Sequence, residues 1–180
     1  MAAERVRSVI LLCPQLHRWD SKQWLPVSSR WTLPVLKRRT LRRILLWLYR
    51  FQLPRLSVNQ YLKMQAGERY ADVVDDPLSK KLCEDTLAAM AQGTRCTGFE
   101  NDFLIFKDEE ILGNGGTIEA PTLVLHDELD PMAPVDHVDW FISRVPHCER
   151  ISPQVAGHLV WAGRDADLMH ETRVRFLKGQ

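Results

Sequence analysis

The 180-residue sequence has the length of one domain, and its 45% hydrophobic and 26% charged residues are typical of a globular protein. No apolar run approaches the roughly 18 residues that a membrane-spanning helix needs, and Pro14 ends the short apolar stretch near the N-terminus, which resembles a strand more than a signal peptide. The four cysteines show no metal-ligand spacing, so we expect reduced thiols in the core and a cytoplasmic protein.

The net charge of +1 conceals a strongly basic segment. Between Asp20 and Glu68 there is no acidic residue, and every charged side chain in that interval is Lys or Arg. Four of the six tryptophans lie in or beside it: Trp19, Trp24, Trp31 and Trp47. This change in composition predicts a separate subdomain.

The first half of the chain predicts one strand followed by helices. Residues 4–13 form a near-continuous apolar run, typical of a strand that is covered on both faces. Residues 36–50 predict an amphipathic helix with Leu41, Ile44, Leu45 and Leu48 on one stripe. Asp76-Pro77 predicts the start of a further helix, which ends at Gly93.

The second half predicts strands that alternate with helices. Residues 103–106 are a candidate short strand, and residues 113–116 a turn. A buried strand is expected over 122–125, a helix after Pro134, a strand over 151–155 and a final helix from Asp165 to Leu177, with Asp165 as its N-cap. The alternation predicts an α/β fold with parallel strands around a long helical insertion.

Acidic side chains follow the strand at 122–125, and a histidine follows the next strand. Asp127, Glu128 and Asp130 form a polar turn, and His158 comes directly after a glycine. The carboxyl ends of parallel strands meet at one sheet edge, where sites of this class of fold lie. Taken singly, Asp130 also fits an ordinary turn or helix cap, and His158 a solvated turn residue. The other histidines show no metal-ligand spacing, so no metal site and no cofactor is expected.

Three stretches together resemble the C-terminal part of the α/β-hydrolase fold. Residues 4–12 resemble its sixth strand, and residues 156–158 its histidine turn. Residues 120–134 resemble its seventh strand and acid turn, P-T-L-V-L-H-G-x-x-D-x-x-x-P. Asp75-Asp-Pro-Leu78 is similar to a cap motif of acylglycerol-lipase-like and serine-aminopeptidase-like members. The resemblance implies a partial hydrolase core from residues 1–14 and 101–180, with a helical cap or lid from residues 15–100.

The same resemblance implies that Asp130 is the acid and His158 the base of a catalytic triad. A neutral imidazole accepts the proton of the nucleophile, and a carboxylate on its other nitrogen orients the ring. Asp127 replaces the usual glycine of the acid turn, so we expect it to tolerate a left-handed and strained backbone there. Asp127 is thus an alternative acid, and the spacing favours Asp130.

The nucleophile of this family is missing from the 180 residues. No serine lies in a G-x-S-x-G elbow, and the family order places that elbow before the first strand. Cys13 is followed by Pro14 at a strand end, so we do not expect it on a strained elbow or as a substitute nucleophile. A bare edge is expected on the first strand, which invites pairing with another chain. Three explanations are open: a longer native product, a partner that covers the edge, or a poorly stable fragment. We expect the first, an incomplete sequence or a shortened reading frame.

Two hypotheses for function follow. The first is a serine hydrolase acting on a carboxylic ester or lipid-like ester, inactive as this chain alone; amide, epoxide and haloalkane substrates remain open. The second is a non-catalytic binding module that uses the basic, Trp-rich cap at an anionic membrane surface or a partner protein. The competing interpretation of that cap is a lid helix whose apolar stripe covers a substrate channel. Nucleic-acid binding is not expected, because the basic segment has no reader motif.

Overall fold

The computed structural model describes residues 6–14, 35, 38–52, 55–92 and 118–179 of the chain. Within these residues three parallel strands form a sheet in the order β1 (Val9–Leu12), β2 (Thr122–Leu125) and β3 (Cys148–Ile151). The register pairs Leu12 with Leu125 and Leu125 with Ile151, so all three strands end level with one another. The residues that follow the strands therefore gather at one sheet edge.

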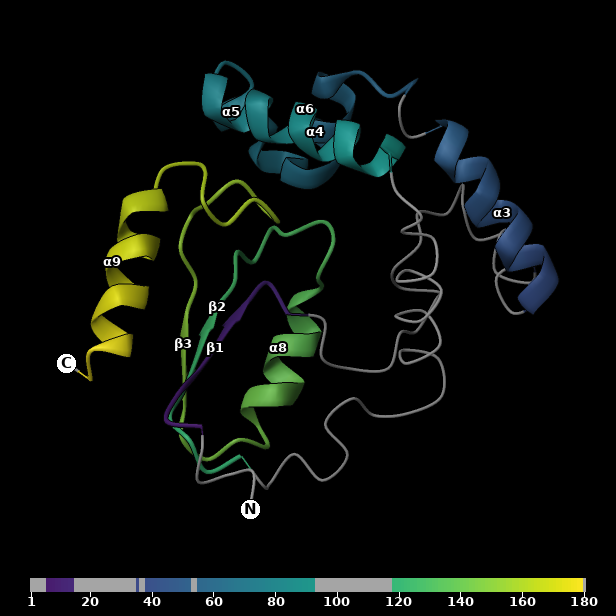
Figure 1. Ribbon diagram of the computed structural model, residues 1–180. Coiled ribbons are helices and arrows are strands. Elements are labelled where there is room, and N and C mark those ends of the chain that lie inside the picture. The colour runs from purple at the N-terminus through teal and green to yellow at the C-terminus, as the bar shows by residue number, and fades with distance from the viewer. Residues whose placement is uncertain (1–5, 15–34, 36–37, 53–54, 93–117, 180) are drawn as a thin grey trace.

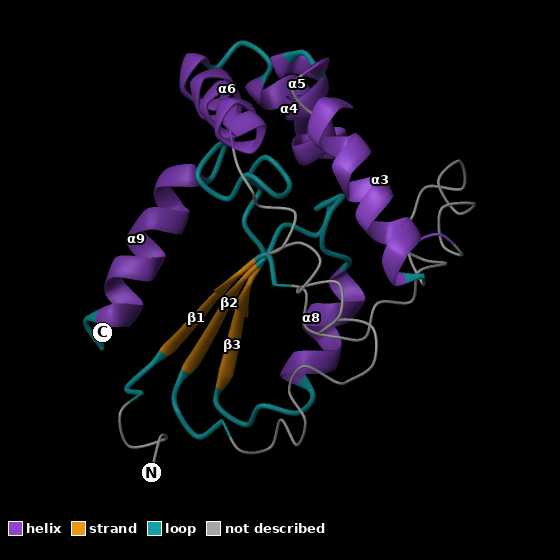
Figure 2. Cartoon of the chain, turned by 45° about the vertical axis from the view of Figure 1, so that its right-hand side comes forward, coloured by secondary structure: helices purple, strands orange, loops and turns teal. Residues whose placement is uncertain are grey.

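One helix covers each face of the sheet, α8 (Val135–Ile142) on one side and α9 (Ala166–Leu177) on the other (Figure 2). Side chains of β2 alternate between the two faces. Leu123 and Leu125 belong to the apolar cluster with Met169 of α9, whereas Val124 packs with Phe141 of α8. Every residue of β2 is buried, so both faces of this central strand are fully covered.

β1 is less enclosed than the sequence predicted. Its first three residues are half-buried, and Leu12 is 39% exposed. In the described part of the chain, β1 pairs only with β2 and forms an edge of the sheet. Ile10 packs against the cluster on the α9 side and Leu11 against the cluster on the α8 side, so apolar side chains contact β1 on both faces as expected. The partial exposure of β1 follows from its place at the edge of the described sheet.

Between β1 and β2 the chain forms α3 (Arg39–Gln52), α4 (Val58–Ala66), η4 (Gly67–Arg69), α5 (Tyr70–Val73) and α6 (Pro77–Gln92). Helices α4, α5 and α6 lie beyond the carboxyl ends of the strands, and α3 extends to one side (Figure 1). We call α3 to α6 the cap helices. Their apolar core includes Leu62, Ala66 and Val73, and it continues into Ala156 and Leu159 on either side of the histidine turn.

Local sequence explains where two cap helices begin. Ser57 and Gln60 form a reciprocal capping box at the start of α4. Asp76 precedes Pro77 and accepts hydrogen bonds from the amides of Leu78 and Ser79, so α6 begins where the sequence predicted.

The C-terminal elements differ from prediction in two details. β3 runs from Cys148 to Ile151, so it shares only Ile151 with the strand predicted over 151–155. It ends before Pro153, which has no N–H group to continue the ladder. Asp165 precedes α9 as expected, but its side chain does not cap that helix. Its Oδ2 atom accepts from the amide of Gln154 at 2.7 Å and thus ties the chain after β3 to the start of α9.

Several predictions fall outside the described residues: the strand at 103–106, the turn at 113–116, Cys96 and three of the tryptophans. The division into a core of residues 1–14 and 101–180 and a cap of residues 15–100 stays a prediction. Cys13 and Cys83 are buried free thiols, as expected, while Cys148 is half-buried and free. Of the helices that the structure describes, none is long and apolar enough to cross a membrane.

Candidate active site

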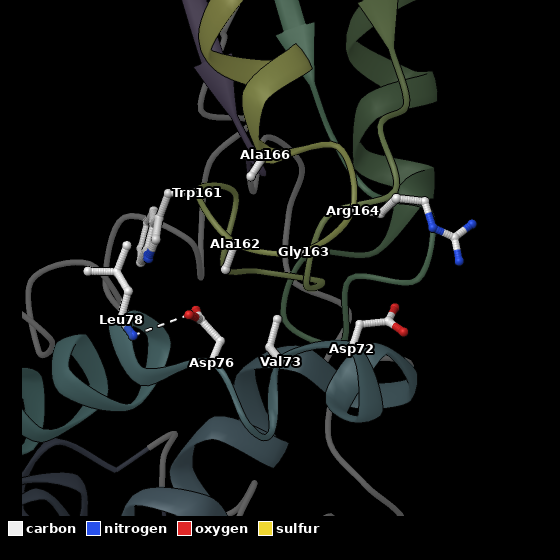
Figure 3. A pocket seen from close by; sticks show the side chains of 9 residues that line it. All are labelled: Asp72, Val73, Asp76, Leu78, Trp161, Ala162, Gly163, Arg164 and Ala166. Carbon is white, nitrogen blue, oxygen red and sulfur yellow. Dashed lines mark hydrogen bonds between the residues drawn. The ribbon is translucent and has the colours of Figure 1, made fainter.

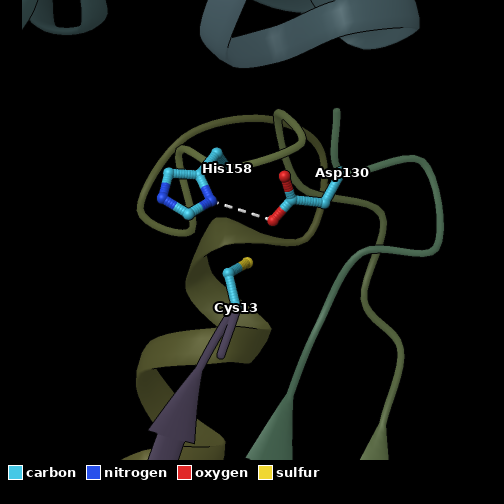
Figure 4. Close-up of side chains that lie close together, drawn as sticks. All are labelled: Cys13, Asp130 and His158. Carbon is cyan, nitrogen blue, oxygen red and sulfur yellow. Dashed lines mark hydrogen bonds and ion pairs between the residues drawn. The ribbon is translucent and has the colours of Figure 1, made fainter. Parts of the chain in front are cut away.

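Each of the three strands is followed by one titratable side chain that lies at the same edge of the sheet. Cys13 follows β1, Asp130 lies in the turn after β2, and His158 lies in the turn after β3 (Figure 4). One ligand-type atom from each residue lies within 4.8 Å of the others. Residues far apart in the sequence thus form one cluster, because the ends of parallel strands coincide in space.

Asp130 and His158 form the pair that the sequence predicted. Nδ1 of His158 lies 2.9 Å from Oδ2 of Asp130. The side chain of Asp130 is fully buried and that of His158 is 36% exposed, so the ring can be reached from solvent while its carboxylate partner cannot. This arrangement suits a base whose ring orientation and tautomer are held by a buried acid.

The two oxygens of Asp130 have different partners. Oδ1 accepts from the amides of Met132 at 2.7 Å and Ala133 at 3.1 Å, which is the ordinary turn-stabilising role of an aspartate. Oδ2 faces His158. The turn interpretation and the catalytic interpretation are therefore compatible, since one carboxylate serves both.

Opposing influences act on the pKa of Asp130. Burial, the largest, raises the pKa. The hydrogen bond and charge of His158, together with the bonds from the Met132 amide and the Cys13 side chain, outweigh it and hold the pKa below the ordinary aspartate value. The residue is thus a carboxylate at neutral pH, as a partner of an imidazolium must be.

Asp127, the alternative acid, points elsewhere. Its Oδ1 atom accepts from the amide of Leu129 at 2.9 Å, and its Oδ2 atom lies 3.3 Å from Nε of Arg69 in the cap. The expected left-handed backbone at Asp127 is wrong, because Cys13 is the one described non-glycine residue with a positive φ. The aspartate that replaces the usual glycine instead joins the acid turn to the cap.

The cap also holds the histidine turn. The amide of His158 donates to the carbonyl oxygen of Gln65 at 3.0 Å, in the last turn of α4. Gly157 has a φ of 59°, and a Cβ atom there would lie 2.9 Å from the carbonyl oxygens of Gln65 and Ala66. Glycine is thus required on two grounds, the left-handed backbone and the close approach to α4.

Cys13 departs from the sequence-based expectation. Its φ of 43° is left-handed, so the strand end is strained and not relaxed. The side chain is buried, and its Sγ–H donates weakly to the carbonyl oxygen of Gly157 over 3.7 Å. Burial, followed by the nearby charge of Asp130, raises the pKa of Cys13 far above the ordinary thiol value. At neutral pH the residue is therefore a thiol.

Sequence reasoning did not include Cys13 in the site. The signal for its inclusion was its position directly after a strand, the same signal that identified Asp130 and His158. As a substitute for the serine, Cys13 is not favoured by its sequence, because a strand end followed by Pro14 does not predict a nucleophile elbow.

A cavity of about 520 Å³ lies between the cap and the loop after the histidine turn (Figure 3). Asp72 and Asp76 line it from the cap, and Trp161 and Arg164 from the loop. Neither Asp130 nor His158 is among its lining residues. A reacting carbonyl must come within hydrogen-bonding reach of the base, so this cavity is separate from the Asp130–His158 site.

Comparison with known proteins supports the fold and nothing finer. No protein-family model and no curated protein matches the chain. Among solved structures it is similar to an α/β-hydrolase fold protein from Nakamurella multipartita, with a TM-score of 0.63 and 20% identity over 99% of this chain. The chain has part of the α/β-hydrolase fold. It spans 64% of the length of that solved α/β-hydrolase, and the parallel three-stranded sheet with helices on both faces agrees with this assignment.

Proposed function

We propose that this chain provides the acid, the base and the cap of a serine-type α/β-hydrolase that cleaves a carboxylic ester or a lipid-like ester. The observation that carries the proposal is the 2.9 Å contact between Nδ1 of His158 and Oδ2 of Asp130 at the carboxyl edge of the sheet. His158 accepts the proton of the nucleophile and passes it to the leaving alcohol, and Asp130 stabilises the imidazolium.

The nucleophile is expected outside the 180 residues, because none of their serines lies in a G-x-S-x-G elbow. An elbow on an in-frame upstream segment or on a neighbouring polypeptide would complete the triad. Without it, the chain lacks both the nucleophile and the amide donors that stabilise the oxyanion, which together supply most of the rate enhancement of such enzymes. We therefore expect the chain alone to be inactive.

A fluorophosphonate probe tests this proposal, since it labels an activated serine. The 180-residue chain should remain unlabelled, and the product that includes the upstream coding sequence should be labelled at the elbow serine. In that longer product, D130N and H158Q should each reduce the labelling rate by about a thousandfold or more. Two results would overturn the proposal. The first is that neither the upstream coding sequence nor any partner found in a pull-down contains a G-x-S-x-G elbow. The second is that H158Q leaves the labelling rate unchanged.

The exposed surface of α3 favours the second candidate function, docking of the cap on an anionic membrane. Five large apolar side chains of this helix are 37–55% exposed: Leu41, Ile44, Trp47, Leu48 and Phe51. Their spacing places them on one stripe. Arg43, also exposed, borders the stripe, while Arg42 on the opposite side of the helix is buried.

This arrangement resembles that of helices lying at a membrane interface, with apolar side chains toward the acyl chains and arginine near the phosphates. A lid helix whose apolar stripe faces a channel formed with further residues would show the same exposure, so vesicle binding is needed to separate the two interpretations. The rings of Trp47 and Phe51 lie edge to face, with centroids 4.7 Å apart, and so form a single aromatic element on the exposed surface.

Cosedimentation with vesicles tests membrane docking. At low salt the chain should bind vesicles that contain phosphatidylserine, bind phosphatidylcholine vesicles weakly, and dissociate as salt is added. The double variant I44Q/L48Q should lose at least about tenfold in partitioning. The matched control is L177Q, which removes an apolar side chain that is 65% exposed on α9. Absence of binding to anionic vesicles at low salt, or an equal loss in the control, would exclude this function.

A further inference from the structure

The cluster at the sheet edge combines three different metal-binding side chains. Cys13, Asp130 and His158 offer sulfur, oxygen and nitrogen atoms that lie within 4.8 Å of one another. Figure 4 shows the sulfur of Cys13 directed toward the gap between the imidazole ring and the carboxylate. The side chains converge because adjacent parallel strands end level, which is why no ligand spacing was visible in the sequence.

The ligand set selects the class of metal. Thiolate and imidazole favour zinc and related transition metals, whereas magnesium and calcium prefer oxygen ligands. Around a tetrahedral zinc ion, neighbouring ligand atoms are about 3–4 Å apart, given bonds of roughly 2.0–2.3 Å. The present spacing comes close to that geometry. Nδ1 and Oδ2, 2.9 Å apart, need to separate by only a few tenths of an ångström, and the sulfur, within 4.8 Å of both, needs to approach by no more than about 1.3 Å.

Two further observations indicate that the cluster is held in place. Cys13 keeps its left-handed backbone, a conformation that costs about 1 kcal/mol for a residue with a Cβ and that tends to persist at functional sites. Asp130 also has orienting contacts outside the cluster, because the amides of Met132 and Ala133 donate to its Oδ1 and leave Oδ2 directed to the other two residues.

We propose that Cys13, Asp130 and His158 bind a zinc ion, with the fourth coordination position open to water. On binding, the thiol of Cys13 releases its proton to solvent, and the sulfur forms a bond to the metal. The proton on Nδ1 of His158 moves to Nε2 of the same ring, so the ion can bind Nδ1 of His158 and Oδ2 of Asp130. Both groups are thereby withdrawn from proton transfer. Zinc would thereby inhibit any acid–base chemistry at this edge.

Metal binding can be tested without any enzymatic activity, so its outcome is independent of the hydrolase proposal. Metal-free protein of 180 residues is titrated with Co²⁺, the spectroscopic substitute for Zn²⁺. We expect saturation at one equivalent, a sulfur-to-cobalt charge-transfer band in the near ultraviolet and intense tetrahedral bands in the visible. An equimolar amount of Zn²⁺ should abolish these bands, because zinc prefers the tetrahedral site.

Variants separate this site from adventitious binding. C13S should remove the charge-transfer band, and H158Q should weaken Co²⁺ binding at least about tenfold. The matched control is C83S, which changes a buried thiol in the apolar core of the cap and should leave the spectrum unchanged. Circular dichroism of each variant checks its folding, and H158Q alters a side chain that is already partly exposed.

Three results would overturn the proposal. The first is a folded wild-type protein that gives no charge-transfer band. The second is a band that persists in C13S, which would place the metal on another cysteine. The third is a folded H158Q variant with unchanged affinity, which would remove the histidine from the ligand set.

Discussion

The main-chain amide of His158 donates to the carbonyl oxygen of Gln65 across 3.0 Å, so the end of α4 holds the histidine turn by its backbone. A second contact joins the cap to the acid turn, where Nε of Arg69 lies 3.3 Å from Asp127. The cap thus contacts both turns that carry the candidate acid and base. Substitutions that break either contact should therefore alter the positions of the two turns.

Gly157→Ala should destabilise the protein by about 2–4 kcal/mol, because the new Cβ meets two carbonyl oxygens and the backbone is left-handed. Gly179→Ala is the matched control: its φ is 74°, but nothing lies within 4 Å of the new Cβ. The control should cost about 1 kcal/mol at most, since only the backbone preference remains. Urea denaturation measures the free energy of unfolding of both variants. An equal decrease in the two would show that α4 does not pack closely on the histidine turn.

Arg69→Ala should destabilise the fold by about 1–3 kcal/mol, because it leaves the buried carboxylate of Asp127 without its cation. Lys81→Ala removes an ion pair with Asp85 in which both side chains are about 60% exposed, and it should leave stability almost unchanged because solvent screens the pair. Chemical denaturation of the two variants gives the comparison. A loss no greater for Arg69 than for Lys81 would mean that the ion pair to the acid turn contributes little.

Asp76→Ala should cost about 1 kcal/mol, since Asp76 accepts from the amides of Leu78 and Ser79 at the start of α6. Asp75→Ala changes the adjacent aspartate, whose side chain is 98% exposed and whose ion pair with Lys80 is long, at 3.9 Å. That variant should be close to neutral. Thermal unfolding distinguishes the two, and equal effects would remove the N-cap role from Asp76.

Protonation of Asp130 at low pH should lower the free energy of unfolding. Its folded-state pKa lies below the ordinary value, so the carboxylate stabilises the fold above the unfolded-state pKa, and that stabilisation is lost as the pH falls through the folded-state pKa. Between about pH 5 and about pH 2, the stability of the wild type should therefore fall more steeply than that of D130N. Denaturation at several pH values gives both slopes. Parallel slopes would show that Asp130 has no lowered pKa.

Local sequence was sufficient to predict several secondary-structure elements. The apolar run at Thr122–Leu125 predicted β2 because a strand buried on both faces carries no polar alternation, and Asp76-Pro77 predicted the start of α6 because capping depends on neighbouring residues. The strand predicted over 151–155 missed the start of β3 at Cys148, because pairing with Thr122 of β2 decides where the ladder begins. That partner is not visible within the strand's own sequence.

By itself, the sequence determined that Asp130 and His158 would lie at one edge of a parallel sheet, since each follows a strand and parallel strands end at the same edge. Only the tertiary structure decided the partners of each side chain there. In the structure Asp127 pairs with Arg69, Asp130 pairs with His158, and Cys13 lies beside the Asp130–His158 pair. The reason is that contacts between residues distant in the chain depend on strand register and on how the cap packs, and short motifs encode neither.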